Sequence, residues 1–264
     1  MAGADVMAAP WPRIESASNP VLKQWRRLHG HGSAYRNEGV CWLEGEHLIE
    51  AALQQGVRLQ RVIWRDAPAA FALPPDVPQA VMASALWRQV SQLDQPPTVA
   101  AQMAWPGAGE LRPDAATVVL DAVQDPGNVG AVLRSAAAFG YQQVVALRGS
   151  AGLWSPKVLR AAMGAHFALH LVEDQPVAAL TGLRVPLWAT SSHRGEWLHQ
   201  LPRVWPCAWL IGNEGKGLSD QAASYAAQWV RIAQPGGQES LNAAVAAGIC
   251  LYSTRAAASD EPPG

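Results

Sequence analysis

The stretch DAVQDPGNVGAVLRSAAAFG, Asp121–Gly140, decides the fold of the second half of the chain. It follows Thr117–Leu120, an apolar and β-branched run that is typical of a buried strand. The turn residues Asp125–Asn128 predict that the strand ends there, and a helix is expected to begin at Val129. One face of this helix carries apolar residues at helical spacing, whereas the other carries small residues and a single long cation, Arg134. A strand, a turn and a helix with such a thin surface indicate a site for an anionic ligand.

Two common nucleotide-binding motifs are excluded. The dinucleotide fingerprint G-x-G-x-x-G fails because this loop has only Gly127 and Gly130. The phosphate loop fails because Gly212–Gly217 has the wrong spacing and no Ser or Thr follows Lys216. A nucleotide-dependent oxidoreductase therefore lacks its usual signature here.

Three short motifs follow one another along the chain. The first has Asn128, Gly130 and Arg134 at the spacing Asn-x-Gly-x-x-x-Arg. The second is Leu210–Gly215, continued by Gly217-Leu218-Ser219, and the third is Glu239–Asn242, which leads into 243–252. Together they resemble the motifs of the SpoU/TrmH family of RNA ribose 2′-O-methyltransferases.

Composition limits the number of domains, the kind of RNA site and the cellular compartment that are expected. With 264 residues and 49% hydrophobic content, the chain can bury one or two domains. Twenty basic against 21 acidic residues leave a net charge of −1, so any RNA site must be a local patch. Cys41, Cys207 and Cys250 form no C-x-x-C pair, which fits core packing in a reduced, cytoplasmic protein. No apolar run reaches membrane-spanning length, and Met1–Pro12 reads as a loose tail.

The first unit, residues 13–105, alternates predicted helices and strands, as a small α/β sandwich does. Asn19-Pro20 is a helix-start signal, and Ser84 is expected to cap a short helix. The expected helices are 21–28, 46–55 and 84–93, and the expected strands are 40–45, 58–64 and 79–83.

An excess of three positive charges lies between Arg13 and Arg65. The candidate RNA-contacting residues there are Lys23, Arg26, Arg27 and Arg36. A solvated helix face explains the same charges, and the sequence leaves both interpretations open. His29 and His31 have no further ligands at metal-site spacing, so a polar loop is expected instead of a metal centre.

Proline and glycine between residues 105 and 114 predict the boundary to a second unit, 114–258. Its apolar strands, at 117–120, 143–147, 186–190, 208–212 and 229–233, alternate with helices and predict a parallel sheet buried on both faces. Ligands of such sheets bind beyond the carboxyl ends of the strands, where all three motifs lie. Ser155-Pro156 predicts a helix over 157–167, whose Lys157 and Arg160 either meet phosphate or are solvated charges.

The resemblance implies a fold and partners. It implies a SPOUT-type parallel sheet with a C-terminal trefoil knot over roughly Leu210–Tyr252, preceded by a small ribosomal-protein-like domain that binds the RNA substrate. It also implies S-adenosylmethionine as cofactor, no metal, and a homodimer in which the small-residue faces of residues 130–138 and 243–247 pack together. The implied cofactor-binding residues are Thr190, Gly212, Ile232 and Leu241. Without the motif, Ile232 and Leu241 would read as ordinary core.

The implied catalytic residues are Arg134, Asn128, Glu214, Ser240 and Asn242. By resemblance Arg134 acts on the ribose 2′-hydroxyl. An arginine is protonated at any ordinary pH, so positioning a phosphate or stabilising a developing alkoxide is easier than acting as a base. Glu214 is expected to hold Arg134 or a neighbouring donor. An isolated Asn or Ser would read as a helix cap, and here capping and function can coincide.

One departure from the family pattern stands near the third motif. Family members often carry Pro-Met where this chain has Ala233-Gln234, so the rigidity of this loop and the cofactor affinity are expected to differ. The function that follows is methylation of a ribose 2′-hydroxyl in rRNA. The alternatives are a tRNA substrate and a non-catalytic ribosome-assembly factor that binds RNA.

Overall fold

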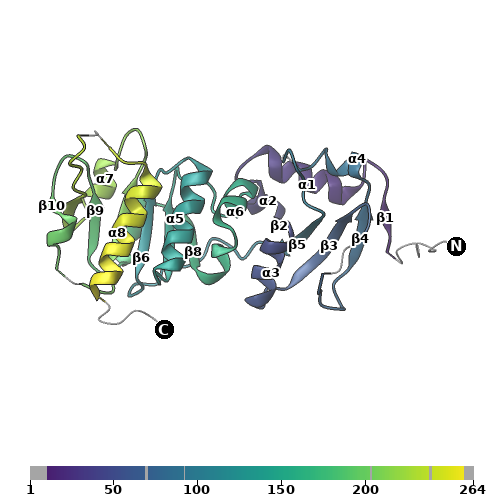
Figure 1. Cartoon of the computed structure of the whole chain (residues 1–264), viewed down its shortest axis with the longest axis horizontal. Helices are drawn as coiled ribbons and strands as arrows, with labels where there is room; N and C mark the ends of the chain where they lie inside the picture. Colours follow the sequence, from purple (N-terminus) through teal and green to yellow (C-terminus); the bar gives the residue numbers. More distant parts are fainter. Residues whose placement is uncertain (1–10, 69–70, 92, 203, 238–239, 259–264) are drawn as a thin grey trace. The chain divides into compact units, whose positions relative to one another are not determined.

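The computed structural model describes residues 11–68, 71–91, 93–202, 204–237 and 240–258. The chain divides into two compact units, Met1–Trp105 and Pro106–Gly264, each built on its own sheet (Figure 1).

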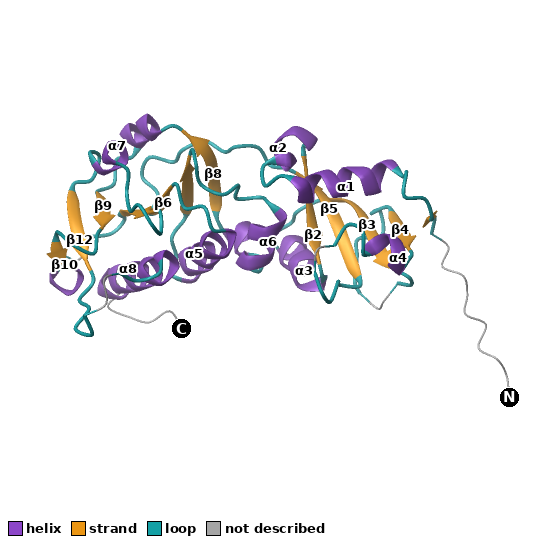
Figure 2. Cartoon of the chain, turned by 90° about the horizontal axis from the view of Figure 1, so that it is seen from above, coloured by secondary structure: helices purple, strands orange, loops and turns teal. Residues whose placement is uncertain are grey.

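Within its described residues, the first unit holds a five-stranded mixed sheet in the order β1-β4-β3-β5-β2. The edge strand β2 runs antiparallel to β5, and β3 runs antiparallel to β5 and parallel to β4. Helices α1 and α3 lie on opposite sides of this sheet (Figure 2). The elements are β1 (Arg13–Ile14), α1 (Pro20–Gly30), α2 (Ala34–Glu38), β2 (Val40–Glu44), α3 (Glu46–Gln54), β3 (Leu59–Arg65), β4 (Gln79–Met82), α4 (Ser84–Trp87) and β5 (Val99–Ala104).

The start of α1 confirms the predicted cap, because the side chain of Asn19 accepts a hydrogen bond from the backbone N–H of Val21 at 2.9 Å. The last predicted helix of this unit is wrong in length and cap. Helix α4 ends at Trp87, and Ser84 lies inside it with its hydroxyl bonded to Asp66. Helix α2 and strands β1 and β5 are not predicted from the sequence.

The second unit has, among its described residues, a seven-stranded sheet in the order β10-β12-β9-β11-β6-β7-β8. Every pair of neighbouring strands is parallel, which confirms the prediction of a parallel sheet. The strands are β6 (Thr117–Asp121), β7 (Gln143–Leu147), β8 (His170–Gln175), β9 (Leu187–Thr190), β10 (Glu196–Trp197), β11 (Ala208–Gly212) and β12 (Gln228–Arg231). The α-helices are α5 (Pro126–Ala138), α6 (Pro156–Ala162), α7 (Asp220–Ala223) and α8 (Ala243–Ala258), and the 3₁₀ helices are η1 (Ala165–Ala168), η2 (Val177–Gly182) and η3 (Leu198–Gln200).

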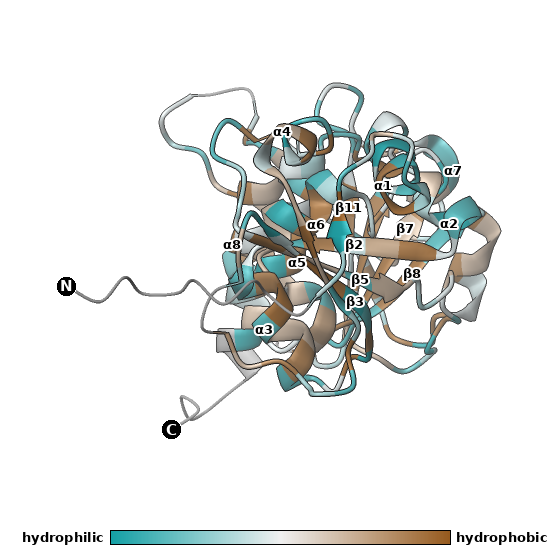
Figure 3. Cartoon of the chain, turned by 90° about the vertical axis from the view of Figure 1, so that its right-hand side faces the viewer, coloured by the Kyte–Doolittle hydropathy of each residue, from teal (hydrophilic) through white to brown (hydrophobic). Residues whose placement is uncertain are grey.

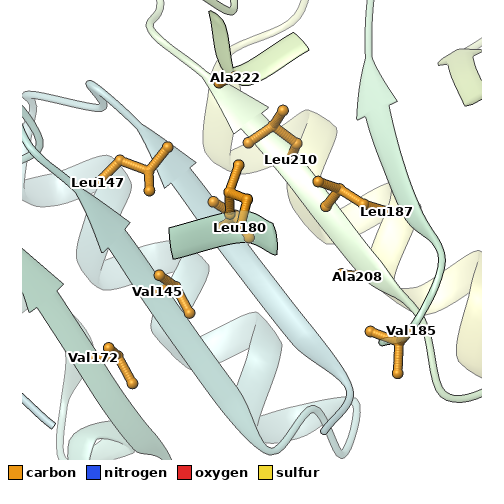
Figure 4. Packing of buried hydrophobic residues seen from close by; sticks show 10 residues of the cluster. Val145, Leu147, Val172, Leu180, Val185, Leu187, Ala208, Leu210 and Ala222 are labelled. Carbon is orange, nitrogen blue, oxygen red and sulfur yellow. The ribbon is translucent and has the colours of Figure 1, made fainter. Parts of the chain in front are cut away.

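Helices cover both faces of this sheet. Helices α5 and α8 pack side by side on one face, and α7 lies on the other (Figure 2). Between the sheet and α7, a cluster of buried side chains includes Val145, Leu180 and Leu210 (Figure 4). The labelled strands of the sheet are largely hydrophobic (Figure 3), and on α7 Asp220 and Gln221 are exposed whereas Ala222 is buried. Burial on both faces explains why the strands read as continuous apolar runs.

Two helices of this unit differ from their prediction. Helix α5 begins at Pro126, because Asp125 is its cap and accepts a hydrogen bond from the N–H of Asn128 at 2.8 Å. The residues predicted as a turn are therefore the first turn of the helix. Helix α6 ends before Met163, whose φ is 50°, and Gly164, whose φ is 88°. Two consecutive left-handed residues end an α-helix, so residues 165–168 form a separate 3₁₀ turn.

The stretch expected to link the units is bound into the second one. The carbonyl of Ala108 accepts a hydrogen bond from the N–H of Glu173, and the carbonyl of Pro113 accepts one from the N–H of Arg184. A Cβ on Gly109 would lie 2.2 Å from the carbonyl oxygen of Leu171, so only glycine allows this approach.

All three cysteines are buried, as predicted. Burial raises the pKa of the Cys207 thiol to about 11, which keeps it protonated and unreactive. Among the helices that the structure describes, none is long and apolar enough to cross a membrane.

The buried His166 generates a prediction on stability. Its Nε2 lies 2.7 Å from the carbonyl oxygen of Leu153, and burial lowers its pKa from 6.5 to about 4 despite that bond. Between these values the unfolded chain takes up a proton that the folded chain refuses, so stability falls as pH falls, by up to about 1.4 kcal/mol per pH unit. Urea unfolding at pH 7 and pH 5 measures this loss. His166→Gln keeps a donor for Leu153 and is expected to lose less; an equal loss in both proteins would contradict the assignment.

Candidate active site

The three motif segments meet at one edge of the second sheet. Strands β6, β11 and β12 are all parallel, so the chain leaves each of them at the same edge. The segments that follow carry Asn128, Glu214 and Asn242, respectively. The expected position beyond the carboxyl ends of the strands is confirmed.

The side-chain amide of Asn128 joins these segments. Its Nδ2 donates to Oε1 of Glu214 at 2.8 Å, and its Oδ1 accepts from Nδ2 of Asn242 at 2.9 Å. Oδ1 of Asn242 in turn accepts from the backbone N–H groups of Ala244 and Val245, which caps α8. Asn242 therefore both caps a helix and forms part of the site. Asn128 does not cap α5, because Asp125 is the cap of that helix, and the side chain of Asn128 bridges Glu214 and Asn242 instead.

The loop after β11 is a tight turn that glycine makes possible. The backbone groups of Asn213 and Gly217 bond to each other in both directions at 2.9 Å. A Cβ on Gly212 would lie 2.5 Å from the carbonyl carbon of Gly217, so no larger residue fits. Oδ1 of Asn213 also accepts from the N–H groups of Gly215 and Lys216, which fixes the backbone that carries Glu214.

A cavity of about 520 Å³ opens beside this loop. All four residues predicted to bind the cofactor line this cavity, together with two of the predicted catalytic residues. These lining residues are Thr190, Gly212, Ile232, Leu241, Glu214 and Ser240. The hydroxyl of Thr190 is occupied, because it donates to the carbonyl of Leu210 at 3.1 Å. The volume suits a small organic ligand.

Arg134 is exposed on α5 and does not line the cavity. Among the described residues it forms no ion pair with Glu214, whose carboxylate instead holds the neighbouring donor Asn128. From the sequence, Arg134 or a neighbouring donor is the expected partner of Glu214, and in the structure the partner is the neighbouring donor Asn128. The guanidinium of Arg134 is therefore available to a ligand. Glu239 lies outside the described residues.

Sequence reasoning missed several residues of the cavity. Ser191–Arg194, after β9, form part of its wall, and the guanidinium of Arg194 lies 3.6 Å from the ring centre of Trp229. Lys216 and Gln234 also line it. Their only sequence signal was position, because every loop at the carboxyl edge of a parallel sheet is a candidate wall.

The two cations predicted on α6 differ in exposure. Lys157 is exposed, whereas Arg160 is half-buried and its Nη1 has no hydrogen-bond partner. Helix α6 packs against α5, where Gly130 lies beside Ala161 and Ala162.

Most of the cations predicted on the first unit have partners within that unit. Arg27 donates to both carboxylate oxygens of Glu38, at 2.5 and 3.0 Å. Arg26 bonds to Ala17 and Gln89, and Arg36 lies over the ring of Tyr35. Lys23 is exposed. These pairs support the solvated-face interpretation for part of the surface.

The two histidines of this unit lie in different surroundings. Nε2 of His29 lies 3.0 Å from Oε1 of the buried Glu44 and accepts from the indole of Trp25 at 3.1 Å, so His29 belongs to the core and not to a polar loop. His31 is exposed. In the part of the chain that the structure describes, no three His, Cys, Asp or Glu side chains gather as a metal site.

Gly130 generates a prediction because α5 and α6 touch there. A Cβ at this position would lie 2.3 Å from Cβ of Ala161 and 2.7 Å from its carbonyl carbon. Gly130→Ala is therefore expected to destabilise the fold by about 1–3 kcal/mol. Gly248→Ala is the matched control, since its Cβ would meet only Oγ of Ser135 at 3.5 Å, and alanine favours the helix by up to about 1 kcal/mol. Urea unfolding compares them, and equal stability of the two variants would contradict the packing argument.

Comparison with known proteins agrees with this geometry. The sequence profile of the SpoU rRNA methylase family matches residues 115–252. The 23S rRNA (guanosine(2553)-2′-O)-methyltransferase of Bacillus subtilis is 30% identical over 250 residues, which cover 92% of this chain and 99% of that protein.

Two solved structures are similar over both units. The SpoU methyltransferase AviRb of Streptomyces viridochromogenes, in complex with S-adenosylmethionine, has a TM-score of 0.80 and 26% identity, covering 90% of this chain and 97% of its own. An rRNA methyltransferase of Sinorhizobium meliloti with S-adenosylmethionine bound has a TM-score of 0.81 and 25% identity, covering 92% and 97%.

Proposed function

The chain belongs to the SpoU rRNA methylase family, and from this membership we propose that it transfers a methyl group from S-adenosylmethionine to a ribose 2′-hydroxyl of rRNA. The observation that carries the proposal is the cavity beside the Asn128 bridge. It gathers the four residues implied as cofactor-binding together with Glu214 and Ser240, and Glu214 is bonded to Asn128, which is bonded to Asn242.

The residues of the cavity fit this cofactor. Ile232 and Leu241 supply apolar walls, and Gly212 allows a ligand to approach the backbone. Lys216 and Arg194 are cations that suit the carboxylate of the methionine part, and Glu214 suits its ammonium group. When bound, S-adenosylmethionine supplies an electrophilic methyl carbon.

The protein has to align the hydroxyl and help it lose its proton. In such a transfer the ribose 2′-oxygen would bond to the methyl carbon as the carbon–sulfur bond breaks, S-adenosylhomocysteine would be the leaving group, and the hydroxyl proton would pass to water. Holding the two partners in line lowers such a barrier by roughly 7–11 kcal/mol. We assign to Arg134 the adjacent phosphate and the developing negative charge on oxygen, because its guanidinium is exposed and remains charged. Asn128, Ser240, Asn242 and Glu214 shape the site around the ribose.

Arg134→Ala tests this assignment. The side chain is exposed, so stability is expected to change by no more than about 0.5 kcal/mol. The rate of transfer of labelled methyl groups to rRNA is expected to fall at least about a hundredfold, and the dissociation constant of S-adenosylmethionine to stay unchanged. Arg134→Lys is expected to restore little, because it lacks the planar fork.

Arg112→Ala is the matched control for this variant. Arg112 is also exposed, but it lies at the opposite, amino end of the sheet strands, hydrogen-bonded through its backbone to Gln143 at the start of β7. The control is expected to methylate at the wild-type rate. A folded Arg134→Ala protein with near-normal transfer would show that the catalytic assignment is wrong. Loss of folding would show that Arg134 is structural.

We propose rRNA as the class of RNA that the protein methylates. The related enzyme of B. subtilis acts, by its name, on a guanosine of 23S rRNA, and this favours rRNA over tRNA. The match to that enzyme covers 92% of this chain and so includes the first unit, which we propose as the RNA-binding domain. Lys23 on that unit, and Lys157 on the second, are the exposed cations best suited to phosphate. An rRNA substrate places the protein, in our proposal, in the cytoplasm.

A non-catalytic assembly factor is the second candidate function, and it uses the same fold. The bonds among Asn128, Glu214 and Asn242 argue against it, since a module that only binds RNA has no need of a cofactor cavity with this wall. Cofactor binding without transfer to rRNA or tRNA would favour it.

We further propose that the C-terminal segment is tied in a trefoil knot. Strand β11 lies between β6 and β9 in the sheet, and the chain then forms β12 before α8 returns to pack against α5. This path supports the knot that the family resemblance implies.

We also propose a homodimer, through a surface that includes more of α8 than the expected one. Of the small residues expected to meet, Gly130, Ala243 and Ala247 are buried within the chain, whereas Ala131 and Ala244 are half-buried and Ala138 is exposed. Helix α8 also exposes Val245, Ile249 and Tyr252, with 50%, 37% and 61% of each residue accessible. Such an apolar stripe suits a second copy of the same helix.

Ile249→Glu tests the dimer. A buried charge in this stripe is expected to give a monomer. Light scattering should report twice the chain mass of 28.1 kDa for the wild type and the single mass for the variant. Met163→Glu is the control, because Met163 is 48% exposed but lies outside α8, and it should remain dimeric. A monomeric wild type, or a dimeric Ile249→Glu protein, would refute the proposed interface.

A further inference from the structure

Gln234, in the wall of the cavity, has a buried side-chain oxygen for which the described residues supply no hydrogen-bond donor. The residue lines the cavity, and its Oε1 is buried and accepts no hydrogen bond from any residue that the structure describes. Buried side-chain oxygens in native proteins are almost always bonded, so such an atom calls for an explanation. A donor that arrives with a ligand supplies one.

The side chain can meet such a donor. Rotation about the terminal bond of a glutamine is soft, so the amide can turn Oε1 toward a ligand without displacing the backbone. The glutamine amide offers a ligand one acceptor and two donors.

The chemistry of the wall indicates which part of the ligand Gln234 meets. The charged ends of the methionine part match charged side chains, namely Glu214 for the ammonium group and Lys216 or Arg194 for the carboxylate. The neutral amide of Gln234 is left for a neutral donor. The amino group of adenine with its neighbouring ring nitrogen pairs with a glutamine amide by two hydrogen bonds, which a ribose hydroxyl does not.

Resting on the proposed function, we propose that Gln234 recognises the amino edge of the cofactor's adenine and is a specificity-determining residue of this chain. Its Oε1 accepts from the adenine amino group, and its Nε2 donates to the adjacent ring nitrogen. The glutamine thus positions the cofactor but takes no part in methyl transfer.

Calorimetry with two ligands tests the proposal on the full chain. One ligand is S-adenosylhomocysteine, and the other is its purine analogue, in which hydrogen replaces the adenine amino group. Gln234→Met removes the amide at similar length. It is expected to weaken S-adenosylhomocysteine binding about threefold to tenfold and to weaken binding of the analogue less, because the analogue keeps only the bond from Nε2 to its ring nitrogen. Gln221→Met, on the exposed side of α7, is the matched control and should bind both ligands as the wild type does.

The pair of ligands separates recognition from structure. Equal weakening of both ligands by Gln234→Met would show that the residue only supports the loop, and unchanged affinity for both would show that it meets no donor; either result overturns the inference. Wild-type binding of S-adenosylhomocysteine in those experiments keeps the proposed function intact. A wild-type chain that binds neither ligand would contradict the proposed function itself, and this inference with it.

Discussion

The side-chain amide of Asn128 is the interaction on which the site depends. It accepts from Asn242 and donates to Glu214, and these residues lie 114 and 86 positions further along the chain. A parallel sheet makes this possible because all its strands release the chain at one edge. Each segment alone is a loop or the start of a helix. The hydrogen bonds of Asn128 to Glu214 and Asn242 join the three segments and fix the position of Glu214 in the wall of the cavity.

Close backbone approach is the second constraint, and it explains the glycines of the motifs. Gly130 lets α5 and α6 touch, and Gly212 lets the loop after β11 fold back onto Gly217. These glycines act through packing, whereas the roles that we propose for Arg134 and Glu214 depend on charge. The motif therefore mixes residues that build the site with residues that we propose to perform its chemistry.

The sequence predicted what local pattern controls and failed where distant partners decide. Apolar β-branched strands such as β6 were found, but β5, with three alanines in six residues, gave no strand signal. The start of α5 was misplaced because Asp-Pro-Gly-Asn serves equally as a turn and as a cap with a first helical turn. The pairing of Arg27 with Glu38 depends on how α1 and α2 pack. The Asn128 bridge to Glu214, in contrast, follows one of the two options that the residue types allowed.

A crystal structure of the chain with S-adenosylhomocysteine tests the central claim most directly. The account predicts that the ligand lies in the cavity between the loops after β9, β11 and β12, in contact with Ile232 and Leu241. Two other hollows of the second unit are available as alternatives, one lined by Arg112 and His170 and one by Leu198 and Tyr252. A ligand bound in either of these, with the cavity beside Asn128 left empty, would contradict the account.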